Sequence, residues 1–223
     1  MIDLMQDLNK RIDHSALKAV VNENAIISLC NEARQFGFFA VAVNPVWVKR
    51  AADLLQDSGV TVVSTVGFPL GANRTDVKAV EAAKAVADGA AEIDMVANIG
   101  WIKSGNFKGV EDEVAQIRRS VPFNILLKVI IEAPLLAVKE QTYATEAVIA
   151  GGAQFVKTST GFSGDVTVGQ VRTILKATDG QIKVKASGGI RSPEQCRDLI
   201  KAGANRLGSS SSVLIMQKLK SAK

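Results

Sequence analysis

Three lysines interrupt apolar, β-prone runs of the chain: Lys128 in LLKVII, Lys157 in FVKTS and Lys185 in KVKAS. A strand of a parallel sheet is covered on both faces, so an ammonium group there is costly unless it is paired or deprotonated. On neighbouring strands the three would face one another, and repulsion together with desolvation would lower the pKa of at least one. A neutral lysine amine is the form that attacks a carbonyl carbon and makes a Schiff base.

Asp94, in the apolar run EIDMV, is the candidate acid–base partner of these lysines. Its carboxylate could carry the proton of a hydroxyl group or of a carbinolamine. A purely structural interpretation stays open beside this one. In it, each lysine extends its amine to the rim of the fold or pairs with an acid such as Glu132 or Asp94, and no covalent chemistry follows.

Turns rich in glycine and serine follow the last three apolar runs. Their sequences are TSTG at 158–161, SGG at 187–189 and GSSSS at 208–212. Backbone N–H groups in such turns, together with a helix N-terminus, form the recurrent phosphate site of α/β barrels. Tight turns need glycine in any case, but the placement of all three turns after successive runs favours phosphate binding.

The sequence favours neither a metal centre nor a serine-hydrolase site. His14 is the only histidine and has no second histidine or cysteine at ligand spacing, so we expect no metal. No GxSxG motif is present, so we expect His14 to be a hydrogen-bonded residue of the core or rim. Cys30 and Cys196 form no CxxC motif, which predicts two free buried thiols in a reducing compartment.

Apolar, β-prone runs alternate with helical patterns along the whole chain. Helical periodicity marks Asn22–Phe36, Val77–Ala87 and Val138–Ala150, and capping sequences such as Ser192-Pro193 start further helices. We expect eight strands, at Arg11–His14, Phe39–Val43, Val60–Val66, Glu92–Val96, Ile125–Ile131, Phe155–Thr158, Ile182–Ala186 and Arg206–Gly208.

This order of elements predicts an α/β fold: a single (β/α)8 TIM barrel with an extra N-terminal helical segment, in one domain over residues 1–223. The active site should then lie at the carboxyl ends of the strands, where Asp13, Asp94 and the three lysines would emerge. The alternative is a doubly wound open sheet. Such a sheet normally carries a glycine-rich loop after its first strand, and none follows the first two runs.

Composition excludes several classes of protein. With 47% hydrophobic residues and 2 cysteines in 223 residues, the chain is neither disordered nor disulfide-rich. Its apolar runs fall far short of the roughly 20 residues that span a bilayer, and no signal peptide is visible, so we expect a cytoplasmic protein without membrane contact. The net charge of +5 suits phosphorylated substrates. No stretch interleaves aromatic and basic residues, so we expect no nucleic-acid partner.

The sequence resembles the deoxyribose-phosphate aldolases, a metal-independent family that uses a catalytic lysine. The resemblance extends in order along nearly the whole chain, and the combination of VKTSTGF with KASGGIR is its most specific part. The chain departs from the family pattern at Phe162, where some members carry Lys. The matching blocks are IDHSALK (12–18), GFPLGA (67–72), EIDMV (92–96), LKVIIE (127–132), FVKTSTGF (155–162) and KASGGIR (185–191).

The resemblance implies a Schiff base on Lys157, with Lys185 lowering the pKa of that amine and relaying protons. Asp94 would act on a hydroxyl proton during carbon–carbon cleavage, and Asp13 and Lys128 would support the relay. The implied reaction is the reversible cleavage of 2-deoxy-D-ribose 5-phosphate to D-glyceraldehyde 3-phosphate and acetaldehyde, with small-molecule substrates and no cofactor. The substrate phosphate would lie against Gly161, Gly188, Gly189, Ser210 and Ser211.

Other interpretations remain open. A different lysine-dependent sugar-phosphate aldolase, or a transaldolase, would share the barrel and its lysines. A sugar-phosphate isomerase or synthase would bind its substrate through the same lysines without a covalent bond. Helix faces rich in Ala and Val could cover the barrel or form a homodimer, so the sequence leaves the oligomeric state undecided.

Overall fold

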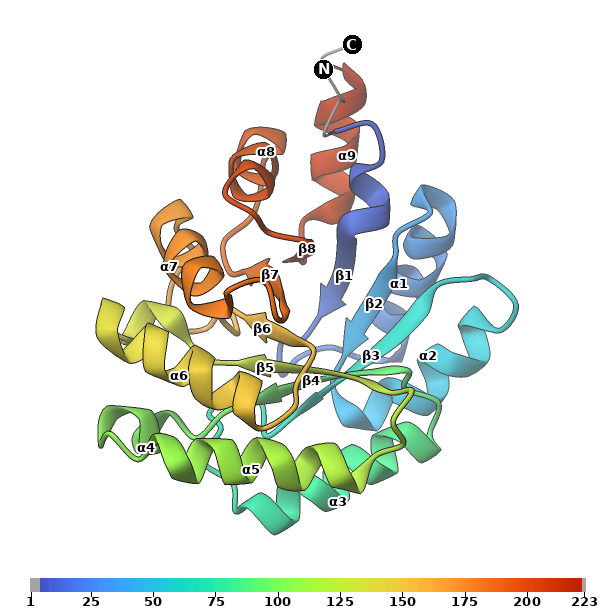
Figure 1. The fold of residues 1–223 in the computed structure, drawn as a ribbon. Coiled ribbons are helices and arrows are strands. Elements are labelled where there is room, and N and C mark those ends of the chain that lie inside the picture. Colours follow the sequence, from blue (N-terminus) through green and yellow to red (C-terminus); the bar gives the residue numbers. More distant parts are fainter. Residues whose placement is uncertain (1–4, 222–223) are drawn as a thin grey trace.

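The computed structural model describes residues 5–221, in which parallel strands pair in chain order and close, β8 against β1, into a barrel (Figure 1). Each strand lies where an apolar run predicts it, so the (β/α)8 barrel is confirmed. The open-sheet alternative is wrong because this sheet has no edge strand. The strands are β1 (Ile12–Ala16), β2 (Ala40–Val43), β3 (Thr61–Val66), β4 (Glu92–Val96), β5 (Leu126–Ile130), β6 (Phe155–Lys157), β7 (Lys183–Ser187) and β8 (Arg206–Ser209).

Helices surround the barrel (Figure 1). They are α1 (Glu23–Phe36), α2 (Val48–Leu55), α3 (Thr75–Ala87), α4 (Ile99–Lys103), α5 (Phe107–Ser120), α6 (Val138–Ala150), α7 (Val168–Thr178), α8 (Pro193–Lys201) and α9 (Ser212–Ser221). Short 3₁₀ turns are η1 (Leu8–Arg11), η2 (Pro45–Trp47) and η3 (Ala133–Leu135). From residue 5 onward, the extra N-terminal helical segment is one 3₁₀ turn, η1. Within residues 5–221, no helix combines the length and apolarity needed to cross a membrane.

Local sequence signals account for the ends of these helices. The Asn22 side chain accepts a hydrogen bond of 3.0 Å from the Ala25 N–H at the start of α1. At the start of α7, Thr167 and Gln170 form the reciprocal capping box that their spacing predicts. Helix α1 ends at Gly37, whose φ of 63° lies in the left-handed region that glycine adopts without strain.

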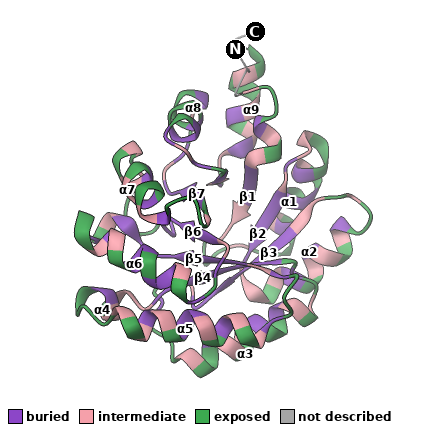
Figure 2. Cartoon of the chain, viewed as in Figure 1, coloured by how far each residue is buried: buried purple, intermediate pink, exposed green. Residues whose placement is uncertain are grey.

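The apolar core lies mainly between the barrel and its helices, and Figure 2 shows the strands and the inward helix faces as buried. The free thiols of Cys30 and Cys196 belong to this layer, as predicted. Burial raises the pKa of Cys30 to about 11 and that of Cys196 to about 12. Both thiols therefore act as small apolar groups of the core.

Strand register decides which side chains enter the barrel interior. Asp94 pairs with Lys128 across β4 and β5, and Lys157 pairs with Lys185 across β6 and β7. Because alternate residues of a strand point to the same face, these four side chains share the interior. The opposite wall, from β2 and β3, supplies a small apolar cluster of Ala40, Ala42 and Val63. Charge is thus concentrated on one side of the barrel.

Candidate active site

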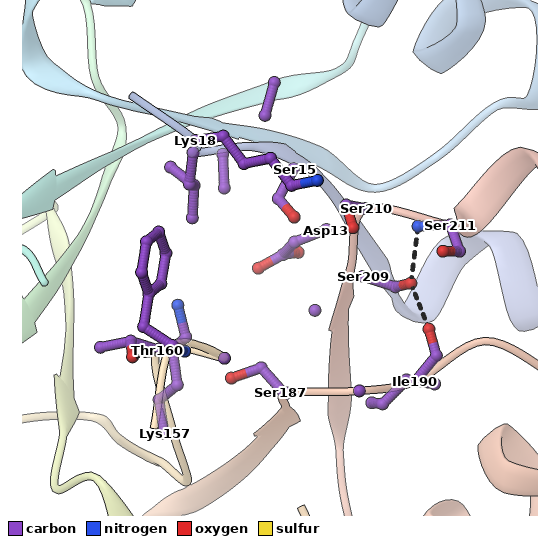
Figure 3. Close-up of a pocket in the computed structure, with 18 of the residues that line it drawn as sticks. Asp13, Ser15, Lys18, Lys157, Thr160, Ser187, Ile190, Ser209, Ser210 and Ser211 are labelled. Carbon is purple, nitrogen blue, oxygen red and sulfur yellow. Dashed lines mark hydrogen bonds between the residues drawn. The ribbon is translucent and has the colours of Figure 1, made fainter. Parts of the chain in front are cut away.

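A cavity of about 830 Å³ opens at the carboxyl ends of the strands (Figure 3). Asp13, Lys157 and Lys185 line it from the barrel, and the loops after β1, β6, β7 and β8 form its walls. This is the end of the barrel at which the sequence analysis expects the active site.

The predicted charged residues enter this site from deeper in the barrel than expected. Asp13, Asp94, Lys128 and Lys185 lie within their strands, and only Lys157 ends one. The prediction that all five emerge at strand ends is therefore wrong in register. Each side chain points into the barrel interior, and the three lysine amines meet at the Asp94 carboxylate.

Asp94 is the centre of the charged cluster. Its Oδ1 accepts a hydrogen bond of 2.9 Å from the Lys128 amine. Its Oδ2 accepts bonds of 2.8 Å from both the Lys157 and the Lys185 amines. Asp94 and Lys128 are fully buried beneath the cavity floor, whereas Lys157 and Lys185 line the cavity.

Asp13 provides a second anchor on the other side of Lys185. Its Oδ2 accepts a short hydrogen bond from the Lys185 amine, and its Oδ1 accepts one of 2.8 Å from Arg206. Lys185 therefore lies between two buried carboxylates. Lys157 contacts only one carboxylate, that of Asp94, and shares it with two other ammonium groups.

This difference in partners separates the two neighbouring lysines in pKa. Burial lowers the pKa of Lys157, Asp94 offsets part of that shift, and repulsion from Lys185 adds to it, leaving a value of about 8. Burial also acts on Lys185, but Asp13 and Asp94 outweigh it and raise the Lys185 pKa above its usual value. At pH 7 a pKa of about 8 leaves about a tenth of the Lys157 amines neutral, against about 0.03% at the ordinary 10.5. Of the two lysines, Lys157 therefore has the larger neutral fraction near neutral pH.

Asp94 and Asp13 both stay ionised. Burial pushes the pKa of Asp94 upward, but Lys128, Lys157 and Lys185 together hold it well below its usual range. The pKa of Asp13 is lowered in the same way, because Lys185, Lys128 and Arg206 outweigh the effect of burial.

The structure brings the five predicted phosphate-binding residues to one wall of the cavity: Gly161, Gly188, Gly189, Ser210 and Ser211. Glycine is required at Gly189, where φ is 70° and a Cβ atom would lie 2.0 Å from the Asp165 carboxyl carbon. The amides of Gly161 and Ser211 already donate to Ser159 and Ser209. These two bonds shape the turns that an anion would approach.

Lys18, which the sequence analysis did not single out, adds a cation to the cavity rim. Its side chain extends toward Ser15 and Ser210 in the view of Figure 3. Among the described cations that line the cavity, Lys18 is the one with no carboxylate in contact, since Arg191 pairs with Asp165 at 3.3 Å.

Two further residues that sequence reasoning missed lie next to the cluster. Glu92 Oε2 lies 2.5 Å from the Lys128 amine, and Arg206 contacts both Asp13 and Glu92. The alternation of the strand was the available signal, because Glu92 lies two residues before Asp94 and so shares its face.

Glu132 does not pair with the lysines. Its two carboxylate oxygens accept hydrogen bonds from Thr160, one of 3.1 Å from the backbone N–H and one of 2.5 Å from the hydroxyl. Glu132 therefore holds the loop after β6 against the end of β5. The ion-pairing alternative of the sequence analysis is right for Asp94 and wrong for Glu132.

His14 lies outside the cavity, as expected for a core or rim residue. Its Nε2 is 2.7 Å from Glu32, and its ring packs 5.1 Å from that of Phe38. Among residues 5–221, no three His, Cys, Asp or Glu side chains gather as they would around a metal ion.

Comparison with known proteins agrees with this geometry. Residues 2–212 match the family described as DeoC/LacD family aldolase. The chain is 46% identical over 215 residues to a deoxyribose-phosphate aldolase of Lysinibacillus sphaericus, covering 96% of each protein. The solved aldolase QR15 superposes with a TM-score of 0.93 at 42% identity, over 97% of both chains. A tetrameric deoxyribose phosphate aldolase from Aeropyrum pernix gives 0.90 at 34% identity, over 97% of this chain and 92% of the other.

Proposed function

The chain belongs to the DeoC/LacD family of aldolases, and from that membership we propose that it cleaves 2-deoxy-D-ribose 5-phosphate reversibly through a Schiff base on Lys157. It is an aldolase, a carbon–carbon lyase. The products are D-glyceraldehyde 3-phosphate and acetaldehyde. One observation carries the assignment of the nucleophile: Lys157 lines the cavity, and its pKa lies at about 8.

The covalent steps follow from a neutral amine in this cavity. Lys157 Nζ adds to the C1 aldehyde of the substrate, and the carbinolamine loses water to give an iminium ion. The iminium accepts the electron pair of the C2–C3 bond as that bond breaks, and the C3 hydroxyl loses its proton to become the aldehyde of the leaving fragment. Glyceraldehyde 3-phosphate leaves, and an enamine of acetaldehyde stays on Lys157. Protonation and hydrolysis of the enamine release acetaldehyde and restore the amine.

Asp94 and Lys185 accept and donate the protons that these steps transfer. Asp94 is fully buried, so a substrate proton reaches it through a bridging water or through the Lys185 amine that contacts its Oδ2 at 2.8 Å. The low pKa of Asp94 lets it hold that proton only briefly. Lys185, which lines the cavity as an ammonium, donates a proton to the enamine carbon and is recharged from Asp94. Lys128 and Asp13 hold these two groups in place.

The phosphate binds on the wall formed by the loops after β6, β7 and β8. The amides of Gly188 and Gly189 and the hydroxyls of Ser210 and Ser211 bind the anion there, and the N-terminus of α9 follows directly. Lys18 supplies the positive charge. Phe162, whose ring packs edge-on against Phe68, presents an apolar surface where some family members carry Lys.

Borohydride trapping with acetaldehyde tests this proposal. Reduction should leave one ethyl group on Lys157, located by peptide mass, and K157M should leave none. The exposed Lys176 serves as the matched control, because K176M should trap as the wild type does. An adduct on Lys185 would exchange the roles of the two lysines. No adduct on a folded protein would overturn the Schiff-base proposal, and trapping only with a ketose phosphate would indicate a different lysine aldolase.

A further inference from the structure

Ion pairs inside the barrel close on themselves in a ring. We call the six residues of this ring the charge ring; in order around it they are Asp13, Arg206, Glu92, Lys128, Asp94 and Lys185. Each residue contacts the next one in this order, and Lys185 contacts Asp13 again, so that negative and positive charges alternate. No member's side chain is more than 10% exposed. Its links include Arg206 to Glu92 at 3.5 Å and Lys128 to Glu92 at 2.5 Å.

Two members of the charge ring lie away from the substrate. Glu92 and Arg206 do not line the cavity. Arg206 is held on the floor of the barrel, where its guanidinium carbon lies 3.5 Å from the centre of the Phe39 ring and 5.8 Å from that of Phe155. Any effect of these two residues on the reaction must therefore pass through the other members.

Charge balance shows what that effect would be. The ring holds three carboxylates and three cations and is neutral as a unit. Lys157 is attached to it through Asp94 and brings a fourth positive charge. A net charge in a buried cluster is costly, so the least costly proton to release is the one that makes the cluster neutral. Loss of one lysine proton has this result. Lys157 contacts a single carboxylate, whereas Lys128 and Lys185 each contact two, so the Lys157 proton is the one held least strongly.

We propose that Glu92 and Arg206 are positioning residues that set the protonation state of Lys157 by completing the charge ring. The groups that face Lys157 come from every charged strand of the barrel: β1, β4, β5, β7 and β8. The walls from β2 and β3 add no charge, and Glu132 is turned to Thr160. The proposal deepens the proposed function, because it concerns the nucleophile on which that function rests.

The proposal predicts shifts of opposite sign for two charge-removing variants. R206M removes a positive charge, so the cluster should retain the Lys157 proton and the pKa of Lys157 should rise by about one unit. E92Q removes a negative charge, so the same pKa should fall by about one unit. The double variant E92Q/R206M restores the charge balance and should return near the wild-type value. R206K keeps the charge and should resemble the wild type.

Reductive methylation of Lys157 measures this protonation without an aldol substrate. Formaldehyde adds to the neutral amine and loses water, and cyanoborohydride supplies the hydride that reduces the imine. The rate at Lys157 is followed by peptide mass from pH 6 to 10 and divided by the rate at the exposed Lys176 of the same sample. The expected midpoints are about 8 for the wild type, higher for R206M and lower for E92Q.

Shifts in the same direction for both variants, or no shift in folded protein, would overturn the proposal. If R206M does not fold, as judged by near-ultraviolet circular dichroism, the isosteric E92Q decides alone, because its midpoint must fall. A failure of the proposed function can be told apart from a failure of this inference. In that case acetaldehyde trapping would give no adduct, but R206M and E92Q would still shift the methylation midpoint of Lys157 in opposite directions.

Discussion

Two buried lysine sites in this molecule show how the same side chain serves structure in one place and chemistry in another. Between α3 and α5, outside the barrel, Lys78 pairs with Glu113 at 2.8 Å, and both side chains are fully buried. Inside the barrel, the lysines around Asp94 are buried to a similar degree. Burial alone therefore does not make a lysine reactive.

The structural pair is balanced and closed. Lys78 also donates to the Val96 carbonyl at 2.9 Å, and Glu113 accepts from the Asn98 N–H at 3.0 Å. One cation meets one anion, and the other hydrogen bonds come from backbone groups at and just after the end of β4 and from the Thr75 hydroxyl at 3.5 Å. Burial lowers the pKa of Lys78 and raises that of Glu113, and each partner opposes the shift of the other.

The barrel cluster is unbalanced and open. Four cations share three carboxylates, and the cavity gives a substrate access to two of the lysines. In the proposed mechanism, an excess of one buried positive charge next to a cavity lowers the pKa of a lysine and makes its amine reactive.

Removal of the nucleophile should have the largest effect and should separate the two sites most clearly. K157M should lower kcat by at least about 10⁴-fold, because no other amine forms the Schiff base. Its thermal stability should equal or exceed that of the wild type, because the variant removes the excess buried charge. Steady-state kinetics and calorimetry measure both. A marked loss of Tm would show that Lys157 has a structural role like that of Lys78.

The converse variant at the structural pair should change stability and spare the chemistry. K78M leaves the Glu113 carboxylate buried without its partner and should cost about 3–5 kcal/mol in free energy of unfolding. The activity per folded molecule and the Lys157 midpoint should stay unchanged. Urea unfolding measures the cost, and K78M/E113Q should recover part of it. An equal loss of stability in the double variant would contradict the ion-pair interpretation.

The pH dependence of imine formation should report the lowered pKa of Lys157. With a pKa of about 8, the rate should rise about tenfold from pH 7 to pH 9 and then level off. The unfolded chain binds more protons at this site between about pH 8 and 10.5, so stability from Lys157 rises with pH across that window. K157M should lack this rise. A rate that still rises steeply above pH 10 would mean that the pKa of Lys157 is that of an ordinary lysine.

The smallest effect is expected from the exposed lysine on the cavity rim. K18A should raise KM for the phosphorylated substrate about fivefold, because a solvent-exposed charge contributes little. The unphosphorylated sugar should show no change, and K176A provides the matched control for loss of one surface charge. An equal change in KM for both sugars would exclude a contact between Lys18 and the phosphate.

The sequence was a good guide to the fold because its signals are local. The alternation of apolar strands with capped helices predicts all eight strands, and helix α6 has the predicted bounds of Val138–Ala150. The ends of the elements differ more from the prediction. The strand expected at Phe39–Val43 begins at Ala40, and the part of the extra N-terminal helical segment that the structure describes is η1.

The sequence by itself also determined which residue types meet in the site. A lysine or aspartate inside a strand that is covered on both faces is costly unless it pairs with an opposite charge, so these residues have to lie near one another. Only the tertiary structure decided the partners. Asp13 contacts Lys185 and Arg206 across 172 and 193 residues of chain, and Glu92 and Arg206 join the cluster although the sequence analysis assigned neither of them a role. Coulomb energy depends on distance in space, and barrel closure sets that distance. The division between a charged Lys185 and a titratable Lys157 follows from it.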